Sequence, residues 1–452
     1  MKRIAYIIFF AAALVLSACS GDDSRQKILK VYNWADYIDE SLLSEFEEWY
    51  FEQTGEEVEV VYQLFDINEI MLAKIERGKE DFDVACPSEY IIARMLKNDL
   101  LLPINKDFGS TPNYLGNVAP YIQNVFSQID GGGKDPNDYA VGYMWGTTGF
   151  LYNPKYVTDE EVSTWSALWN AKFNKKLLIK DAFRDVYSPL LIYANQHRLR
   201  SGEVTLQDLM HDSSDESIAV VEELLKRTKP NVAGWEADFG KEMMPKEKAI
   251  LNLTWSGDAV WAMEEAADVG VELDYTVPKE GSIVWFDGWV IPKYAKNTKA
   301  AAYFINFMCK PENAIRNMDA TGYVSVVTNE EVLDYISSEE EYDEAIDLSY
   351  LFVHADGSPI EGSDSVFTDP VLYPSRSVID RCAVMHDSGD RTDKMLEMWS
   401  RVKGDNLSTG MLVGIIVFFS AMLIWGIARK IASYRKRRKH MKRRHKYAKE
   451  SK

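Results

Sequence analysis

Short apolar runs alternate with longer amphipathic segments along most of this chain. The short runs predict strands at 28–34, 58–62, 82–86, 177–180, 249–255 and 282–291. The longer segments carry apolar residues at helical spacing and predict helices at 39–54, 68–77, 88–97, 220–226, 299–309 and 394–402, the first of them capped by Asp39. Strands that alternate with helices predict an α/β fold with a parallel sheet covered on both faces.

The first predicted strand ends in Val31-Tyr-Asn-Trp-Ala-Asp-Tyr-Ile38, where two aromatic residues and a carboxylate follow an apolar run. Ligands of open α/β sheets bind at the carboxyl ends of the strands. We therefore expect Trp34 and Tyr37 to face a crevice, with Asp36 beside them. Right-handed crossovers would bring the strand ends to one side of the sheet, which adds Ser88 and Tyr90 to the same rim.

An aromatic residue is paired with an acid twice more, in Trp255-Ser-Gly-Asp258 and in Trp285-Phe-Asp287. Each pair follows an apolar run. Aromatic residues at strand ends are often plain core residues, and that interpretation is the alternative here. The repetition of the pattern favours a binding site.

The N-terminal segment has the composition of an export signal. Met1-Lys-Arg precedes an apolar stretch, which predicts secretion. Leu16-Ser-Ala-Cys19 looks like the lipobox of bacterial lipoproteins, in which the cysteine is acylated. We therefore expect residues 1–19 to form a lipoprotein signal, with Cys19 as the lipidated residue. An ordinary signal-peptidase site near Cys19 is the alternative.

The C-terminal segment predicts a membrane anchor. Residues 407–428 are almost wholly apolar and uncharged, and are long enough to span a bilayer as a helix. Residues 429–452 hold 13 of the 51 Lys and Arg residues but only one of the 70 acids, so the rest of the chain has 38 basic and 69 acidic residues, a net charge of −31. The positive-inside rule places this basic tail in the cytoplasm and the acidic body outside the membrane. An acidic body repels nucleic acid and attracts cations.

Nothing in the sequence indicates an enzyme. It lacks H-E-x-x-H, G-x-S-x-G and P-loop motifs, and its six histidines are scattered without ligand spacing. We expect no catalytic residue, no metal and no cofactor. Three cysteines remain in the body, namely Cys86, Cys309 and Cys382. A disulfide between two of them and free buried thiols are both compatible with an exported protein.

Several blocks in order make the chain resemble the spermidine/putrescine-binding proteins of bacterial polyamine ABC transporters, within the periplasmic substrate-binding protein superfamily. The resemblance covers about residues 29–403. The blocks are Val31-Tyr-Asn-Trp-Ala-Asp-Tyr-Ile38, Asp83-Val-Ala-Cys-Pro-Ser-Glu-Tyr90, Tyr143-Met-Trp-Gly-Thr-Thr-Gly149, Trp255-Ser-Gly-Asp258, Val277-Pro-Lys-Glu-Gly281, Trp285-Phe-Asp287 and Gly322-Tyr323.

The resemblance implies a two-lobed periplasmic-binding-protein fold with hinge crossovers, which delivers a polyamine to an ABC transporter permease as a monomer. The implied N-lobe comprises 28–142 and 287–332, and the implied C-lobe comprises 143–286 and 333–404. The implied ligand-binding residues are Trp34, Tyr37, Ser88, Tyr90, Asp181, Asp185, Trp255, Asp258, Trp285, Asp287 and Tyr323, with Asp36 and Met385 as further candidates.

These residue types suit a chain of ammonium groups separated by methylene segments. Aromatic faces cover the methylenes and attract the cations, at roughly 0.5–2 kcal/mol per contact. Carboxylates supply the acceptors that an ammonium group needs once it has left water. Asp287 is expected near the middle of the ligand, with Asp181 and Asp185 towards one end. Core or capping roles are the alternative for each of these residues.

The chain departs from the family pattern at three places. Asp181-Ala-Phe-Arg-Asp185 differs in composition from the usual acidic pair, so that match is looser. Met385 stands where relatives often carry a glutamine, which predicts one missing polar contact. A transmembrane helix with a cytoplasmic tail is also unusual, and it leaves a membrane-tethered polyamine sensor as an alternative function. A receptor for another small cationic solute is a further alternative.

Overall fold

The computed structural model describes residues 25–237, 239–340 and 342–404, together with Val417 and Met422. The sheet and the candidate site lie in the compact unit that ends at Leu396. The predicted signal at 1–19, the span at 407–428 and the tail at 429–452 lie outside the described residues, apart from Val417 and Met422. No helix among the described residues is both long enough and apolar enough to cross a membrane.

Twelve of the strands in the described residues form one sheet. They are β1 (Ile28–Trp34), β2 (Glu59–Phe65), β3 (Val84–Ala85), β4 (Leu101–Leu102), β5 (Ala140–Tyr152), β6 (Leu177–Lys180), β7 (Val232–Glu236), β8 (Leu251–Trp255), β9 (Asp274–Thr276), β10 (Ser282–Pro292), β11 (Val324–Ser325) and β14 (Cys382–Ala383). The main path runs β2-β1-β3-β10-β5-β8-β6-β7. A separate hairpin pairs β12 (Ala345–Ile346) with β13 (Val366–Phe367).

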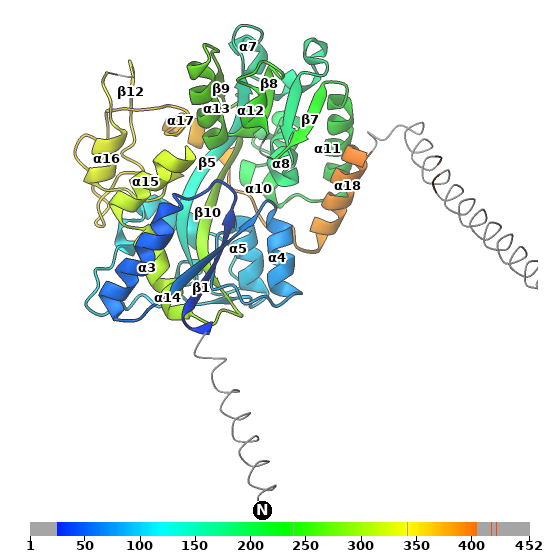
Figure 1. The fold of residues 1–452 in the computed structure, drawn as a ribbon. Helices are drawn as coiled ribbons and strands as arrows, with labels where there is room; N and C mark the ends of the chain where they lie inside the picture. Colours follow the sequence, from blue (N-terminus) through cyan, green and yellow to red (C-terminus); the bar gives the residue numbers. More distant parts are fainter. Residues whose placement is uncertain (1–24, 238, 341, 405–416, 418–421, 423–452) are drawn as a thin grey trace, which may run out of the picture. The chain divides into compact units, whose positions relative to one another are not determined.

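The predicted parallel sheet is confirmed only in part. β1 pairs in parallel with β2 and β3, and β6 pairs in parallel with β7 and β8. The long strands β5 and β10 run antiparallel to each other and connect these two groups. Both strands are buried along their whole length, so their apolar runs carry no signal that distinguishes parallel from antiparallel pairing. Figure 1 shows β5 and β10 side by side, with β1 and the α3–α5 region at one end and β7 and β8 at the other.

Helices cover the sheet. They are α3 (Ser41–Thr54), α4 (Asn68–Glu76), α5 (Glu89–Lys97), α6 (Pro120–Ser127), α7 (Asp159–Val162), α8 (Phe183–Ala194), α9 (Gln196–Arg200), α10 (Leu206–His211), α11 (Asp215–Thr228), α12 (Gly240–Met243), α13 (Ser256–Asp268), α14 (Thr298–Met308), α15 (Pro311–Thr321), α16 (Glu330–Ile336), α17 (Arg376–Ile379) and α18 (Thr392–Gly404). The predicted alternation of strands and helices is therefore confirmed, including each helix proposed from the apolar spacing.

The predicted cap of the first helix is wrong by one position. α3 begins at Ser41 and its N-cap residue is Glu40, whose side chain makes no capping hydrogen bond. Asp39 instead accepts hydrogen bonds from the N–H of Ser41 at 3.0 Å and from Arg316 Nε at 3.0 Å. A carboxylate bonded two residues ahead closes a turn before the helix rather than capping it. The other end follows the prediction, since Gly55 adopts the left-handed conformation with φ 72°.

The three body cysteines are free thiols. Cys86 and Cys309 are buried and Cys382 is half-buried. The structure therefore decides the alternative that the sequence left open, in favour of unpaired cysteines.

Candidate functional site

Asp287 lies where the pairing of the two long strands is irregular. The register between β10 and β5 shifts between Asp287 and Gly288. Such a bulge redirects the side chain of the affected residue. The Asp287 carboxylate accepts one hydrogen bond from Ser88 Oγ at 2.6 Å and one from Tyr37 Oη at 2.9 Å. Side chains from three distant segments therefore meet at a single carboxylate.

The charge of Asp287 has no cationic partner among the described residues. Its side chain is 5% exposed, and both of its hydrogen-bond donors are neutral hydroxyl groups. Burial raises the pKa of Asp287 from 3.8 to about 7, although the two hydroxyl groups oppose the shift. A buried carboxylate in this condition is stabilised by any cation that reaches it.

Asp185 is a second carboxylate of the same kind. It lies in the first turn of α8 and is buried. Its Oδ1 accepts a hydrogen bond from Trp255 Nε1 at 2.8 Å. Burial raises the pKa of Asp185 to about 6, and the charge of Asp185 adds to the rise at Asp287. The negative charge of Asp185 therefore disfavours the ionised form of Asp287.

Aromatic rings form a continuous series around these acids. Ring centroids lie 6.3 Å apart for Trp34 and Trp255, 6.3 Å for Trp255 and Trp285, and 5.6 Å for Trp285 and Tyr323. Tyr37 continues the series at 5.1 Å from Tyr323. The ring of Trp285 reaches Gly146 of β5 so closely that a Cβ added there would lie 2.6 Å from the ring. The aromatic corners predicted from separate motifs are thus in contact.

Ser88 and Tyr90 are linked through one asparagine. Asn68 Nδ2 donates to Ser88 Oγ at 2.9 Å and to Tyr90 Oη at 3.0 Å. Ser88 passes this network on to Asp287. Eight predicted residues therefore form one connected group around Asp287, namely Trp34, Tyr37, Ser88, Tyr90, Asp185, Trp255, Trp285 and Tyr323.

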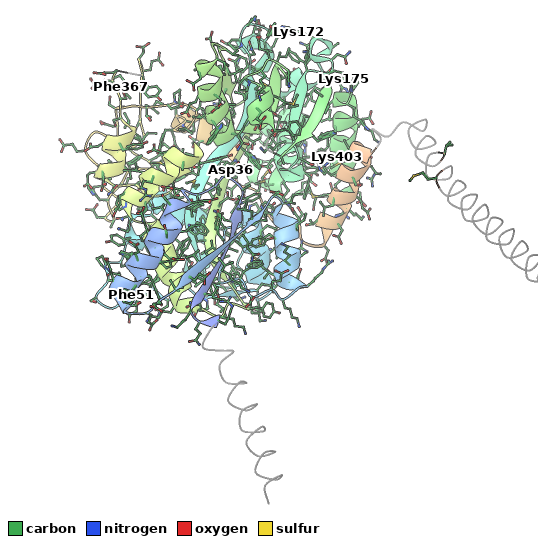
Figure 2. The ribbon with its side chains drawn as sticks, in the orientation of Figure 1. Asp36, Phe51, Lys172, Lys175, Phe367 and Lys403 are labelled. Carbon is green, nitrogen blue, oxygen red and sulfur yellow. The ribbon has the colours of Figure 1, made fainter. Side chains whose placement is uncertain are left out.

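The remaining predicted residues lie at the edge of this group. Asp258 is buried and accepts from Tyr323 Oη at 2.7 Å, but it is also paired with Lys180. The side chain of Asp36 is 68% exposed and lies 3.6 Å from Lys241, at the turn after β1 (Figure 2). Asp181 is half-buried at the end of β6, where its N–H donates to the carbonyl of Glu236. The hydrogen-bond donors to Asp287 among the described residues are Ser88 and Tyr37.

Met385 is buried at 4% exposure and lines a small hollow together with Arg184, Tyr187 and Ser388. Its thioether offers a weak acceptor at most. The structure thus places it beside a cation of the chain itself.

Sequence reasoning missed the charged residues that accompany these acids. Lys180 ends the apolar run of β6 and is 1% exposed. Arg184 follows four residues later, in the first turn of α8, and is 5% exposed. Glu89 is also 1% exposed, and its Oε2 accepts from the N–H of Phe286 at 3.0 Å. A lysine that belongs to a fully apolar strand pattern is the signal that could have indicated a buried cation.

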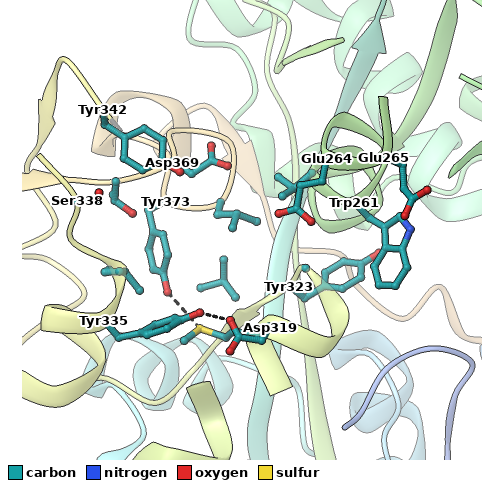
Figure 3. Close-up of a pocket in the computed structure, with 17 residues that line it drawn as sticks. Trp261, Glu264, Glu265, Asp319, Tyr323, Tyr335, Ser338, Tyr342, Asp369 and Tyr373 are labelled. Atoms are coloured by element: carbon teal, nitrogen blue, oxygen red, sulfur yellow. Dashed lines mark hydrogen bonds between the residues drawn. The ribbon is translucent and has the colours of Figure 1, made fainter. Parts of the chain in front are cut away.

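A second hollow borders the group through Tyr323 (Figure 3). Its wall carries the carboxylates of Glu264, Asp319 and Asp369, and Tyr335 donates a hydrogen bond to Asp319. Burial raises the pKa of Asp369 and of Glu264, and the neighbouring acids raise the pKa of Glu264 further. Carboxylates on both sides of Tyr323 make this part of the molecule attractive to cations.

Comparison with known proteins gives one consistent result. The family model described as bacterial extracellular solute-binding protein matches residues 41–344. The spermidine/putrescine-binding periplasmic protein of Salmonella typhimurium is 30% identical over 325 residues, which cover 72% of this chain and 84% of that protein. The protein of the same description from Escherichia coli is 31% identical over 315 residues, covering 69% and 81%.

Solved structures agree in fold. A spermidine/putrescine ABC transporter substrate-binding protein from Streptococcus pneumoniae superposes with a TM-score of 0.58 at 29% identity. The superposition covers 83% of this chain and 98% of that structure. The predicted two-lobed α/β fold is confirmed.

Proposed function

Since this chain belongs to the family of bacterial extracellular solute-binding proteins, we propose that it captures a polyamine between its two lobes and delivers it to an ABC transporter. The family resemblance indicated by the motifs is confirmed by the relatives named for spermidine and putrescine. These relatives favour delivery to a transporter over the sensor alternative. We propose that the protein is not an enzyme.

The observation that carries the proposal is the pair of buried acids, neither of which forms a salt bridge among the described residues. Asp287 accepts hydrogen bonds from two hydroxyl groups and Asp185 accepts one from the Trp255 indole, and rings of Trp and Tyr surround them. An anionic ligand would meet unfavourable charge here. A neutral ligand would leave both acids in their costly ionised form or keep them protonated. An organic polycation satisfies both acids and covers the rings.

We further propose that the lobes divide within β5 and β10. Residues 28–142 and 287–332 would form one lobe, and residues 143–286 and 333–404 the other. The strand pairing supports this division, because β5 contacts β10 through residues 140–147 and β8 through residues 148–152. Trp34 and Trp255, with ring centroids 6.3 Å apart, would then come from opposite lobes and close on the ligand together.

The relatives and the composition of the two terminal segments support a proposal for the location. We propose an extracytoplasmic body, in keeping with the periplasmic relatives, held at the membrane by acylated Cys19, by a helix over 407–428, or by both. The basic segment 429–452 would then lie in the cytoplasm. We propose that the body acts as a monomer that docks on permease subunits.

The test is calorimetric titration of the purified full-length protein with putrescine and spermidine, with glutamate and glucose as controls. The proposal expects saturable binding of at least one amine and no heat of binding from either control. The absence of amine binding, or tight binding of glutamate or glucose, would refute it. The Asp268→Asn variant changes an exposed carboxylate of α13 and should bind like the unmodified protein.

A further inference from the structure

Two cations of the chain itself lie inside the proposed polyamine site. Lys180 is 1% exposed, and its ammonium group pairs with Asp258 and lies 3.7 Å from Glu236. The same Nζ lies 4.1 Å from the ring centroid of Trp255. An ammonium group held between a tryptophan face and a carboxylate is the arrangement expected for a bound polyamine. Lys180 therefore occupies one ammonium position permanently.

Arg184 occupies a second aromatic face. Its guanidinium carbon lies 4.5 Å from the ring centroid of Tyr90, and its Nε lies 3.7 Å from Glu69. The group is fixed by hydrogen bonds from Nη1 to the carbonyl of His386 at 3.1 Å and from Nη2 to Thr392 Oγ1 at 3.0 Å. Because these bonds hold the guanidinium on several sides, a ligand ammonium cannot easily displace it.

The carboxylates that remain are few. Lys180 pairs with Asp258 and lies near Glu236, Lys241 also lies 4.0 Å from Asp258, and Arg184 faces Glu69. Glu89 is 1% exposed with one oxygen bonded to the backbone of Phe286, and burial raises its pKa well above the usual range, which favours the neutral form. Asp185 and Asp287, at 7% and 5% exposure, form no salt bridge among the described residues, although the charge of Lys180 partly offsets the rise in the pKa of Asp185.

We infer that this site selects a diamine over a triamine, with Asp185 and Asp287 each binding one ammonium group and with Lys180 and Arg184 excluding a third. The inference rests on the proposed function and names the ligand class of that same site. Lys180 and Arg184 thereby act as specificity-determining residues.

Trp255 explains why Lys180 limits the length of the ligand. Its Nε1 donates to Asp185 at 2.8 Å, while its ring face carries the Lys180 ammonium. A ligand that extends past Asp185 along this indole would place its next ammonium group beside Lys180. Like charges in a poorly solvated site repel strongly. A third ammonium group therefore lowers affinity here instead of raising it.

The first test compares amines of one, two and three ammonium groups on the full-length protein by calorimetric titration, using butylamine, putrescine, 1,5-diaminopentane and spermidine. A diamine is expected to bind at least tenfold more tightly than spermidine and than butylamine. Spermidine that binds as tightly as the best diamine would overturn the inference while leaving the proposed function intact. If no amine binds, the proposed function fails first.

The second test removes the internal cation. Lys180→Met removes the cation bonded to Asp258 and uncovers the Trp255 face, leaving Asp258 with Lys241 at 4.0 Å, so the ratio of spermidine to putrescine affinity should rise at least tenfold. The double variant Lys180→Met/Asp258→Asn removes the Asp258 carboxylate as well, and its ratio should return towards that of the unmodified protein. An equal rise in both variants would show that space rather than charge sets the preference, and would overturn the inference.

Lys172→Met is the matched control. Lys172 is also paired with a carboxylate, Glu161 at 2.7 Å, and lies 5.8 Å from the ring centroid of Phe173, but it is exposed (Figure 2). In the Lys172→Met variant the ratio of spermidine to putrescine affinity should stay unchanged. The comparison of amines on the unmodified protein needs no variant and stands even where Lys180→Met fails to fold.

Discussion

The Asp287→Asn substitution should weaken amine binding but stabilise the free protein. In the liganded protein it leaves a buried ammonium group without its countercharge. Breaking a buried, hydrogen-bonded charge pair costs about 3–5 kcal/mol, which corresponds to roughly two to four powers of ten in Kd. Asn keeps the shape of Asp287 and one acceptor oxygen for Ser88 or Tyr37, so the loss arises from the charge.

In the free protein the same substitution should be stabilising at neutral to alkaline pH. The pKa of Asp287 is raised from 3.8 to about 7, so above pH 7 its ionised form costs about 4 kcal/mol relative to the unfolded chain. About 1 kcal/mol of the gain is offset because one hydroxyl loses its carboxylate acceptor. The sign follows from the direction of the shift: the cost is present above the folded pKa and disappears below the ordinary one. Asp287→Asn should therefore gain about 3 kcal/mol at pH 8 and less than half of that at pH 5.

The assay is thermal and denaturant unfolding of both proteins without ligand at pH 8 and pH 5, with calorimetric titration of putrescine at pH 8. Asp268→Asn serves as the exposed control and should change neither quantity. An Asp287→Asn protein that keeps its amine affinity within threefold, or that is no more stable at pH 8, would refute the assignment of Asp287 as a buried, cation-seeking acid.

Two other substitutions test the walls of the site. Trp255→Phe removes the indole donor that orients Asp185, and should cost about 1–2 kcal/mol of binding, or roughly tenfold in Kd, by calorimetry; unchanged affinity would mean that Trp255 is only a packing residue. Gly257→Ala places a Cβ 2.3 Å from the ring of Tyr323, so the ring must shift away from Asp258 and the melting temperature should fall by several degrees. Gly270→Ala has open space but φ 74°, and should cost only about 1 kcal/mol of folding free energy. An equal fall in melting temperature for both variants would contradict the close approach at Gly257.

The elements of the fold were predictable because the signals that define them are local. β1 and β6 coincide with their predicted ranges, and the helix at 299–309 is shifted by one residue. The direction of β5 and β10 was not predictable, since a strand buried on both faces shows no alternation of apolar and polar residues. The pairing of these two strands depends on contacts more than 130 residues apart in sequence.

The candidate site was likewise predictable only in part. Trp255 ends β8, a position where ligands of α/β sheets bind, whereas Trp285 and Asp287 lie inside β10 at its register shift, which the apolar runs do not reveal. The neutralisation of Asp258 was invisible, because Lys180 is 78 residues away in sequence and its charge gives no sign of where the side chain ends. Asp36 shows the opposite case, since a carboxylate inside the first motif faces solvent and pairs with Lys241.

Proton release on amine binding tests the central claim most directly, namely that Asp287 and Asp185 are buried acids with raised pKa values that ionise fully when they bind a cation. With pKa values of about 7 and about 6, they hold about one proton between them at pH 6.5 and almost none at pH 8.5. Calorimetric titration of putrescine in two buffers of different ionisation enthalpy measures the protons released. Release of about one proton per ligand at pH 6.5, falling to near zero at pH 8.5, is the expected result. Tight binding without proton release at pH 6.5 would contradict the account.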